Sequence, residues 1–318
     1  MKYDIVALGE LLIDFTENGV SGQGNPILEA NPGGAPCNVL AMMSRLGHNT
    51  AFIGKVGRDM FGEQLKEALE EAGISTIGLV ADDKVHTTLA FVHTFADGDR
   101  EFSFYRNPGA DMMLREEEID LELIKHTGLF HFGTLSMTHD TCRNATKKAV
   151  LMAKESGALI SFDPNIREPL WEDLSLMRQQ IEWGLTKCDI LKISDNEIVW
   201  LTGEEDYDKG VEWIRSRYDI SLILVSLGKE GSIAYSGKER VFVPSFIQEK
   251  TIETTGAGDT FFASALHFVL ENGLKEYTSE ELDRMLTFAN AAASIITTRK
   301  GALRVMPSKK EIEEIIYK

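Results

Sequence analysis

The chain has 318 residues, of which 43% are hydrophobic and 26% are charged, a composition typical of a globular protein that excludes a disordered one. Its 33 Lys and Arg residues against 50 Asp and Glu give a formal net charge of −17, and a field of that sign repels nucleic acid and acidic membrane surfaces. The length is enough for one large α/β domain or about two average domains.

Short β-branched or aromatic runs alternate with amphipathic stretches, as in βαβ units around a mostly parallel sheet. We expect one domain over residues 1–318, an α/β fold of three layers with a doubly wound, mostly parallel sheet. The expected strands are Asp4–Leu8, Thr50–Val56, Leu129–Gly133, Leu159–Asp163, Ile190–Ser194 and Leu222–Ser226, with Ser232–Tyr235 and Arg240–Val243 as a late antiparallel pair. The expected helices are Pro36–Leu46, Phe61–Ala72, Thr141–Ser156, Gly210–Tyr218, Ala257–Asn272 and Ser279–Thr298.

Two insertions, approximately 15–32 and 86–106, interrupt this alternation. The second is typical of a β-hairpin with its turn at Asp97-Gly98-Asp99 and no crossover helix. The first is rich in Gly, Asn and Pro and has few periodic apolar positions. A hairpin with so many apolar side chains is too small to be stable alone. We therefore expect a small β-sheet lid, whose open edges and apolar surface favour a homodimer through the lids.

The cysteine and apolar patterns indicate the compartment. The three cysteines, Cys37, Cys142 and Cys188, include no CxxC pair, which argues against a disulfide framework and a structural zinc site. The early apolar run from Ile5 to Leu8 is too short for a signal peptide. No window approaches the ~18 apolar residues of a membrane span. The sequence predicts a cytoplasmic protein that binds neither membranes nor nucleic acid.

The strongest local signal is Thr-Thr-Gly-Ala-Gly-Asp-Thr-Phe-Phe at 254–262, which leads into an apolar helix. Two glycines permit a tight turn, and successive N–H groups at a helix N-terminus form an anion site strengthened by the helix dipole. An isolated Asp259 could be a simple dipole partner, but five specified residues together are unexpected by chance. The pattern predicts a bound phosphate.

The segment 253–259 resembles the Asp-Thr-x-Gly-Ala-Gly-Asp hallmark of the ribokinase-like, phosphofructokinase-B type carbohydrate kinases, with Glu253 in place of the leading Asp. Other family segments follow in order over essentially the whole chain: Gly9-Glu10 with Asp14, Gly33-Gly34 with Asn38, Asp163–Arg167, Ser226–Gly231 and Arg299–Ala302. Residues 86–111 resemble the bacterial fructokinase branch. The resemblance implies a ribokinase-like fold and transfer of the ATP γ-phosphoryl group to a primary hydroxyl, with D-fructose O6 as the expected acceptor.

The resemblance also implies roles for individual residues. Asp259 would be the catalytic base, with Gly256, Ala257, Gly258 and Arg167 on the transferring phosphate. The sugar-binding residues would be Asp14, Gly33, Gly34, Asn38, Arg106, Asn165 and Asp259. The nucleotide-binding residues would be Lys192, Ser194, Ser226, Gly228, Gly231, Gly256, Gly258 and Asn290.

Two metal sites are implied as well. Glu197 would organise water around Mg²⁺, although Ser194 replaces the Asn that the family often has before it. A monovalent cation, K⁺ in many members, would use the positions of Glu253, Thr255, Ile296 and Gly301. The extra methylene of Glu253 shifts the carboxylate beyond the tolerance of an oxygen-coordinated ion, so this side chain either reaches around the ion or bonds the loop directly. We expect retained but weakened activation.

Plainer interpretations of several residues remain open: Asp14 in a surface turn, Asn38 as a helix cap, Arg106 facing solvent, Arg167 paired with Glu168, Glu197 as a helix-entry carboxylate and the 226–231 glycines as turn signals. Within the family, a 2-keto-3-deoxygluconate kinase, a ribokinase or a nucleoside kinase are the alternatives. From another class, a catalytically idle sugar-binding regulator is an alternative. A Rossmann dehydrogenase is disfavoured because Ile27 follows Gly22-Gln23-Gly24 where a third glycine is needed. No Gly-Lys pair has the context of a P-loop.

Overall fold

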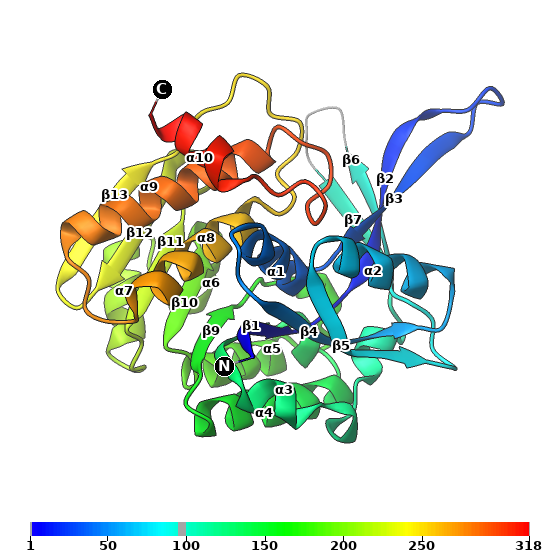
Figure 1. Ribbon diagram of the computed structural model, residues 1–318, viewed down its shortest axis with the longest axis horizontal. Coiled ribbons are helices and arrows are strands. Elements are labelled where there is room, and N and C mark those ends of the chain that lie inside the picture. The colour runs from blue at the N-terminus through cyan, green and yellow to red at the C-terminus, as the bar shows by residue number, and fades with distance from the viewer. Residues whose placement is uncertain (1, 95–99, 318) are drawn as a thin grey trace.

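The strands of this protein form two separate β-sheets (Figure 1). The structure is a computed structural model that describes residues 2–94 and 100–317. The large sheet has nine strands in the order β13-β12-β11-β10-β9-β8-β1-β4-β5, and only β12 and β13 pair antiparallel to their neighbours. Its strands are β1 (Tyr3–Leu8), β4 (Thr50–Gly57), β5 (Ile74–Asp82), β8 (Thr127–Gly133), β9 (Leu159–Asp163), β10 (Ile190–Ser194), β11 (Leu222–Ser226), β12 (Gly231–Ser236) and β13 (Glu239–Pro244).

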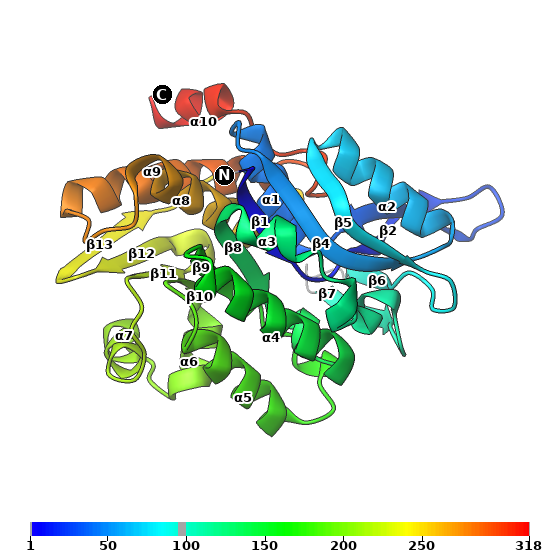
Figure 2. The same ribbon diagram turned by 60° about the horizontal axis from the view of Figure 1, so that its bottom comes forward.

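Helices cover both faces of the large sheet, so the predicted three layers are present (Figure 2). One face carries α1 (Ala35–Arg45), α2 (Met60–Glu71), α8 (Ala257–Asn272), α9 (Ser279–Ile296) and α10 (Lys309–Ile316). The other carries α3 (Leu121–Lys125), α4 (Asp140–Glu155), α5 (Leu174–Leu185), α6 (Asp195–Thr202) and α7 (Tyr207–Arg215). None of the helices in these described residues combines the length and apolarity needed to span a bilayer.

The central strands are apolar on both faces because each face packs against helices. In β1, Ile5 and Ala7 belong to the core layer under α1 and α8, whereas Val6 and Leu8 belong to the opposite layer. This alternation follows from the two-residue period of a strand, and strands buried on both faces are continuous apolar runs. That property made them recognisable in the sequence.

The smaller sheet is the predicted lid, with strand order β3-β2-β6-β7. It consists of β2 (Leu12–Val20), β3 (Pro26–Gly33), β6 (Leu89–Thr94) and β7 (Arg100–Tyr105). The predicted turn at 97–99 lies outside the described residues. Phe15 stacks on Phe91 with ring centroids 5.0 Å apart and meets Phe61 of α2 edge-on at 5.6 Å. These aromatic contacts cover one lid face, as the composition of the hairpin required.

Several elements differ from the expectations. The first lid insertion, expected from residue 15 and with few apolar positions, is the β2–β3 hairpin and begins at Leu12. The edge strand β5 was not predicted, because most of its positions are only half-buried and it contains Gly78. Gly78 is required there, since a side-chain Cβ would lie 2.7 Å from the Phe52 carbonyl oxygen. Helices α3, α5, α6 and α10 were also not predicted.

Candidate active site

A cleft of about 480 Å³ lies where the carboxyl ends of the large sheet's central strands face the lid. Ligands bind at this edge in open α/β sheets. A larger cavity of about 860 Å³ between α1, α2 and residues 299–306 contains none of the predicted site residues. The cleft is lined by Glu10, Leu12, Asp14, Gly34, Ala35, Asn38, Phe104, Leu135, Asn165, Arg167, Lys192, Ser194, Asp195, Glu197, Ser226, Gly228, Thr254, Thr255, Gly256, Gly258 and Asp259.

The predicted anion site is the start of α8. Gly256 is the N-cap residue with φ 76°, and a Cβ at this position would lie 2.6 Å from the Cβ of Ala302. Only glycine satisfies both conditions. The Ala257 N–H donates to the Thr254 carbonyl at 3.2 Å, so this amide stabilises the loop that precedes α8. Gly256 and Gly258 line the cleft, where the positive end of the α8 dipole favours an anion.

The predicted base, Asp259, is held by a residue from the other end of the chain. The Asn38 side chain on α1 is 4% exposed, and its Nδ2 donates to Asp259 Oδ2 at 2.8 Å. Burial raises the pKa of Asp259, while the Asn38 bond and the charges of Lys192 and Arg167 lower it. Asn38 Oδ1 is buried and accepts no hydrogen bond from the described residues. Asn38 therefore orients the carboxylate, a role that the sequence did not indicate.

A buried ion pair lies beside the anion site. Lys192 Nζ of β10 is 2.9 Å from Asp163 Oδ2 at the end of β9. Burial raises the pKa of Asp163 to about 6, against the lowering effect of Lys192. Burial alone would lower the pKa of Lys192, but Asp163, Glu197 and Asp259 raise it overall. The ammonium thus remains charged next to Gly258, where a side-chain Cβ would be 3.3 Å from Nζ.

Glu197 is the N3 residue of a capping box at the start of α6. Its Oε2 accepts the Ser194 N–H at 2.8 Å and its Oε1 accepts the Ile166 N–H at 2.7 Å. Burial opposes ionisation, but Lys192 and the two amides lower the pKa of Glu197 overall. These contacts agree with the interpretation of Glu197 as a carboxylate at the start of a helix. The same side chain also lines the cleft.

The lid side of the cleft centres on Asp14. Burial raises the pKa of Asp14 to about 7, and Arg167 across the cleft lowers it. Gly33 makes room for this carboxylate, because a Cβ at position 33 would lie 2.3 Å from Asp14 Oδ2. Gly34, with φ 133°, begins α1. Arg167 is exposed and donates to the Ile166 carbonyl, and no ion pair with Glu168 is present among the described residues.

Arg106 differs from its predicted setting, because it neither faces solvent nor lines the cleft. It is 7% exposed and its guanidinium donates to Asp111, to Thr138 Oγ1 and to the Leu135 carbonyl. A buried guanidinium needs such partners, and Asp111 could not be identified from the sequence as one. Its role toward the sugar stays a prediction.

Two predicted nucleotide residues also lie outside the cleft lining. Asn290 is 5% exposed, accepts from Ser232 Oγ at 2.9 Å and donates to the Val243 carbonyl at 3.0 Å, so it ties α9 to β12 and β13. Gly231 has φ 127°, and a Cβ there would lie 2.2 Å from the Val243 carbonyl oxygen. Both residues contact strands of the large sheet in this structure. Their contact with a nucleotide remains a prediction.

The predicted cation region surrounds the loop before α8. Glu253, in this loop, bonds the segment after α9 directly, with its Oε1 accepting the Gly301 N–H at 2.7 Å. Ile296 is buried and Thr255 lines the cleft. Over the described ranges 2–94 and 100–317, no group of three or more His, Cys, Asp or Glu side chains is arranged to hold a metal ion.

Glu10 and Phe104 are among the cleft residues that had no predicted role. Glu10 is 3% exposed, accepts the Ala35 N–H at 2.8 Å, and burial raises its pKa to about 7. Its position directly after the first strand is the signal that could have identified it. Phe104 lies on β7 opposite Ala90, which pairs in turn with Asp14. Only the strand register reveals that Phe104 and Asp14 lie in one row across the lid, with Ala90 between them.

Comparison with known proteins agrees with this geometry. The chain is 42% identical over 316 residues to Fructokinase-1 of Zea mays, covering 99% of this chain and 98% of that protein. It is 43% identical over 310 residues to probable fructokinase-2 of Arabidopsis thaliana, covering 96% and 94%.

Solved structures share the fold of this chain. A fructokinase from Xylella fastidiosa with bound ATP superposes with a TM-score of 0.89 at 30% identity, covering 100% of this chain and 99% of that one. A fructokinase from Vibrio cholerae O395 with fructose, ADP and calcium bound has a TM-score of 0.89 at 27% identity, covering 99% and 100%. Residues 2–309 match the model of the pfkB family carbohydrate kinases. This chain therefore belongs to that family, and its predicted base, its predicted anion site and residues of the lid share one cleft.

Proposed function

We propose that the protein is an ATP-dependent fructokinase that converts D-fructose to fructose 6-phosphate. One observation carries the proposal: Asp259, oriented by Asn38 at 2.8 Å, shares a cleft with Asp14 of the lid and the open start of α8. A base, a hydroxyl acceptor and an anion site are thus arranged around one space. The names of the plant and bacterial relatives support the choice of fructose.

The protein's contribution to phosphoryl transfer is positioning and charge neutralisation. The sugar would lie between Asp14 and Asp259, with the Asp14 carboxyl group accepting hydrogen bonds from sugar hydroxyls. Asp259 would accept the proton of the attacking hydroxyl, which then bonds to the γ-phosphorus as the bond to the ADP oxygen breaks. The Gly256–Gly258 turn, Lys192 and Arg167 would stabilise the charge on the phosphoryl oxygens.

Ser226 and Gly228 line the nucleotide side of the cleft at the end of β11, together with Ser194. Asp195 and Glu197, whose carboxylate oxygens suit the water shell of Mg²⁺, line this part of the cleft, so a Mg²⁺ ion would be carried by the nucleotide together with its waters. Glu197 is the carboxylate that would orient water near such an ion. When bound, Mg²⁺ neutralises phosphate charge during transfer.

A neutral sugar fits the cleft better than a keto acid. Recognition of a carboxylate requires a guanidinium with free donors, whereas the donors of Arg106 are bonded to Asp111, Thr138 and Leu135. Arg167 is the exposed guanidinium in the cleft, and we assign it to the phosphate. An idle sugar-binding regulator would have no need for the oriented Asp259.

Fructose should be the preferred acceptor in a coupled ADP-release assay. The panel should contain fructose, ribose, a nucleoside and 2-keto-3-deoxygluconate. A kcat/KM for the keto acid more than about tenfold above that for fructose would overturn the substrate but leave the kinase class. ADP release with none of the sugars, despite sugar binding, would favour the regulator.

Replacing the base should abolish most turnover. Asp259→Asn keeps the shape of the side chain but cannot accept a proton, so kcat should fall by about 10²–10⁴ with a modest change in KM. Steady-state kinetics with fructose measure this, and ATP binding by calorimetry is the control for folding. Turnover near that of the wild type would contradict the assignment.

The pH profile tests the same base through its partner. Asp259 must be deprotonated to act, so kcat falls as the pH drops through its pKa. Asn38→Ala removes a contact that lowers this pKa, and the acidic limb of kcat should therefore move to higher pH. An acidic limb that stays in place would show that another group titrates.

Monovalent cations should activate weakly. A related fructokinase double mutant from Vibrio cholerae O395 was solved with potassium bound, but here Glu253 already bonds Gly301 at 2.7 Å. Rates in KCl, NaCl and a bulky organic cation salt at constant ionic strength should differ modestly. Glu253→Asp, which shortens the side chain, should respond more strongly to K⁺. Strong K⁺ dependence of the wild type would contradict this expectation.

The lid surface favours a homodimer. Val20 and Tyr105 are each 68% exposed, Ile27 is 45% exposed and Leu28 is 40% exposed. Exposed apolar groups on a sheet with open edges are typical of an interface. Sedimentation velocity at micromolar concentration should show a dimer, and a monomer would remove this proposal.

A further inference from the structure

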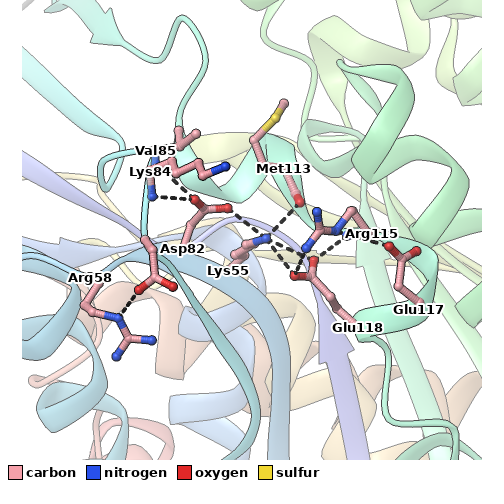
Figure 3. A network of polar contacts seen from close by, with 10 residues as sticks. Lys55, Arg58, Asp82, Lys84, Val85, Met113, Arg115, Glu117 and Glu118 are labelled. Atoms are coloured by element: carbon pink, nitrogen blue, oxygen red, sulfur yellow. Dashed lines mark hydrogen bonds and ion pairs between the residues drawn. The ribbon is translucent and has the colours of Figure 1, made fainter.

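A buried lysine outside the cleft is bonded to both segments that connect the lid hairpin to the large sheet. The Lys55 side chain on β4 is 2% exposed. Figure 3 shows its ammonium among three partners: Asp82 Oδ2 at 2.8 Å, Glu118 Oε1 and Oε2 at 2.8 and 3.0 Å, and the Met113 carbonyl at 3.2 Å. The phosphoryl transfer argued above does not use this cluster.

The partners of Lys55 lie on either side of the β6–β7 hairpin in the sequence. Asp82 ends β5, and its Oδ1 accepts the N–H groups of Lys84 and Val85 at 2.9 and 3.0 Å, fixing the turn that leads into β6 (Figure 3). Met113 and Glu118 belong to the segment that returns from β7. We call the two connections, residues 82–88 and 106–118, the lid root.

The two segments of the lid root are also bonded to each other. Asp111 accepts from Thr88 Oγ1 of the other segment and, at 2.8 Å, from Arg106 Nε of its own segment. The Ala110 N–H donates to the His86 carbonyl at 2.9 Å. A displacement of the lid root at Lys55 is therefore carried to the first residues of β6 and the last residues of β7.

Lys55 also neutralises the charge of two neighbouring carboxylates. Asp82 and Glu118 approach the same ammonium, so without it two carboxylates would lie close together, with Asp82 left to the amides of Lys84 and Val85 and Glu118 left to Arg115. The hydrogen bond from Lys55 holds the pKa of Asp82 down at about 2, so Asp82 is ionised at any working pH. Loss of the ammonium would therefore push the two connections apart.

We propose that Lys55 is a positioning residue that sets the lid hairpin over the sugar end of the cleft. The path is short: Ala90 of β6 pairs with Asp14 and with Phe104, and both of these line the cleft. The inference rests on the proposed sugar-kinase function. The predicted nucleotide residues that line the cleft lie on or next to β10, β11 and α8 of the main body, so sugar binding alone should respond to Lys55.

Kinetics of two variants test the proposal. Lys55→Met should raise the KM for the sugar about tenfold or more, because small misplacements of binding groups are costly, with the ATP KM changed less than about twofold. The triple variant Lys55→Met, Asp82→Asn, Glu118→Gln removes the repulsion and guards against misfolding. Its thermal stability should recover while the sugar KM stays raised. A triple variant with wild-type sugar KM would overturn the proposal.

Hydrogen exchange supplies a readout that needs no substrate. Amides of residues 83–94 and 100–118 should exchange faster in Lys55→Met than in the wild type, with β10 and β11 unchanged. The control is Arg178→Met on α5, a cation that also bonds a carboxylate, Glu182, and a carbonyl, that of Leu201. Equal effects of the two variants on sugar and ATP KM, or unchanged exchange at the lid root, would overturn the proposal. If the wild type phosphorylates no sugar, the proposed function fails while exchange still decides whether Lys55 fixes the lid root.

Discussion

The hydrogen bond from Asn38 to Asp259 is the contact on which the cleft depends, because it joins two helices from opposite ends of the chain at the edge of the large sheet. Burial raises the pKa of Asp259, the proposed base. The Asn38 hydrogen bond and the charge of Lys192 act in the opposite direction without reversing the shift. The start of α1 at Gly34 places Asn38 one turn inside the helix, and Glu10 fixes that start through the Ala35 amide.

Local charge in the cleft opposes the charge of the whole molecule. A chain of net charge −17 repels a nucleoside triphosphate, so cationic side chains must lie close to the phosphates at the site. Lys192 is buried against Asp163 and remains charged, while Arg167 is exposed at the mouth. The first is preorganised and the second is free to move onto a phosphate. A neutral sugar adds no charge to this balance, which is the physical reason that a hexose suits the cleft better than an acid.

The sequence predicted the elements whose signals are local. Strands buried on both faces are apolar runs, and the 254–262 motif carries its own turn and helix start, so both could be located without the fold. Contacts that depend on the fold were missed. The pairing of Arg106 with Asp111 and the placement of Asn290 between β12 and β13 follow from burial, which no local pattern reports. β5 was missed because an edge strand lacks the continuous apolar run of its neighbours.

Glu253 replaces the aspartate of the family pattern, and contacts within the chain still hold the turn at Gly256 in place. The turn at Gly256 has a positive φ and therefore needs restraint from outside to hold its amides in place. Glu253 supplies part of that restraint through the Gly301 amide, and Ala302 supplies the rest by packing against Gly256. Lys300, which precedes Gly301, donates to Asn18 Oδ1 of the lid at 3.1 Å. Residues 300–302 thus contact the lid, the cation region and the anion site at once, so the order of the phosphate-binding turn and the position of the lid are set through the same short segment.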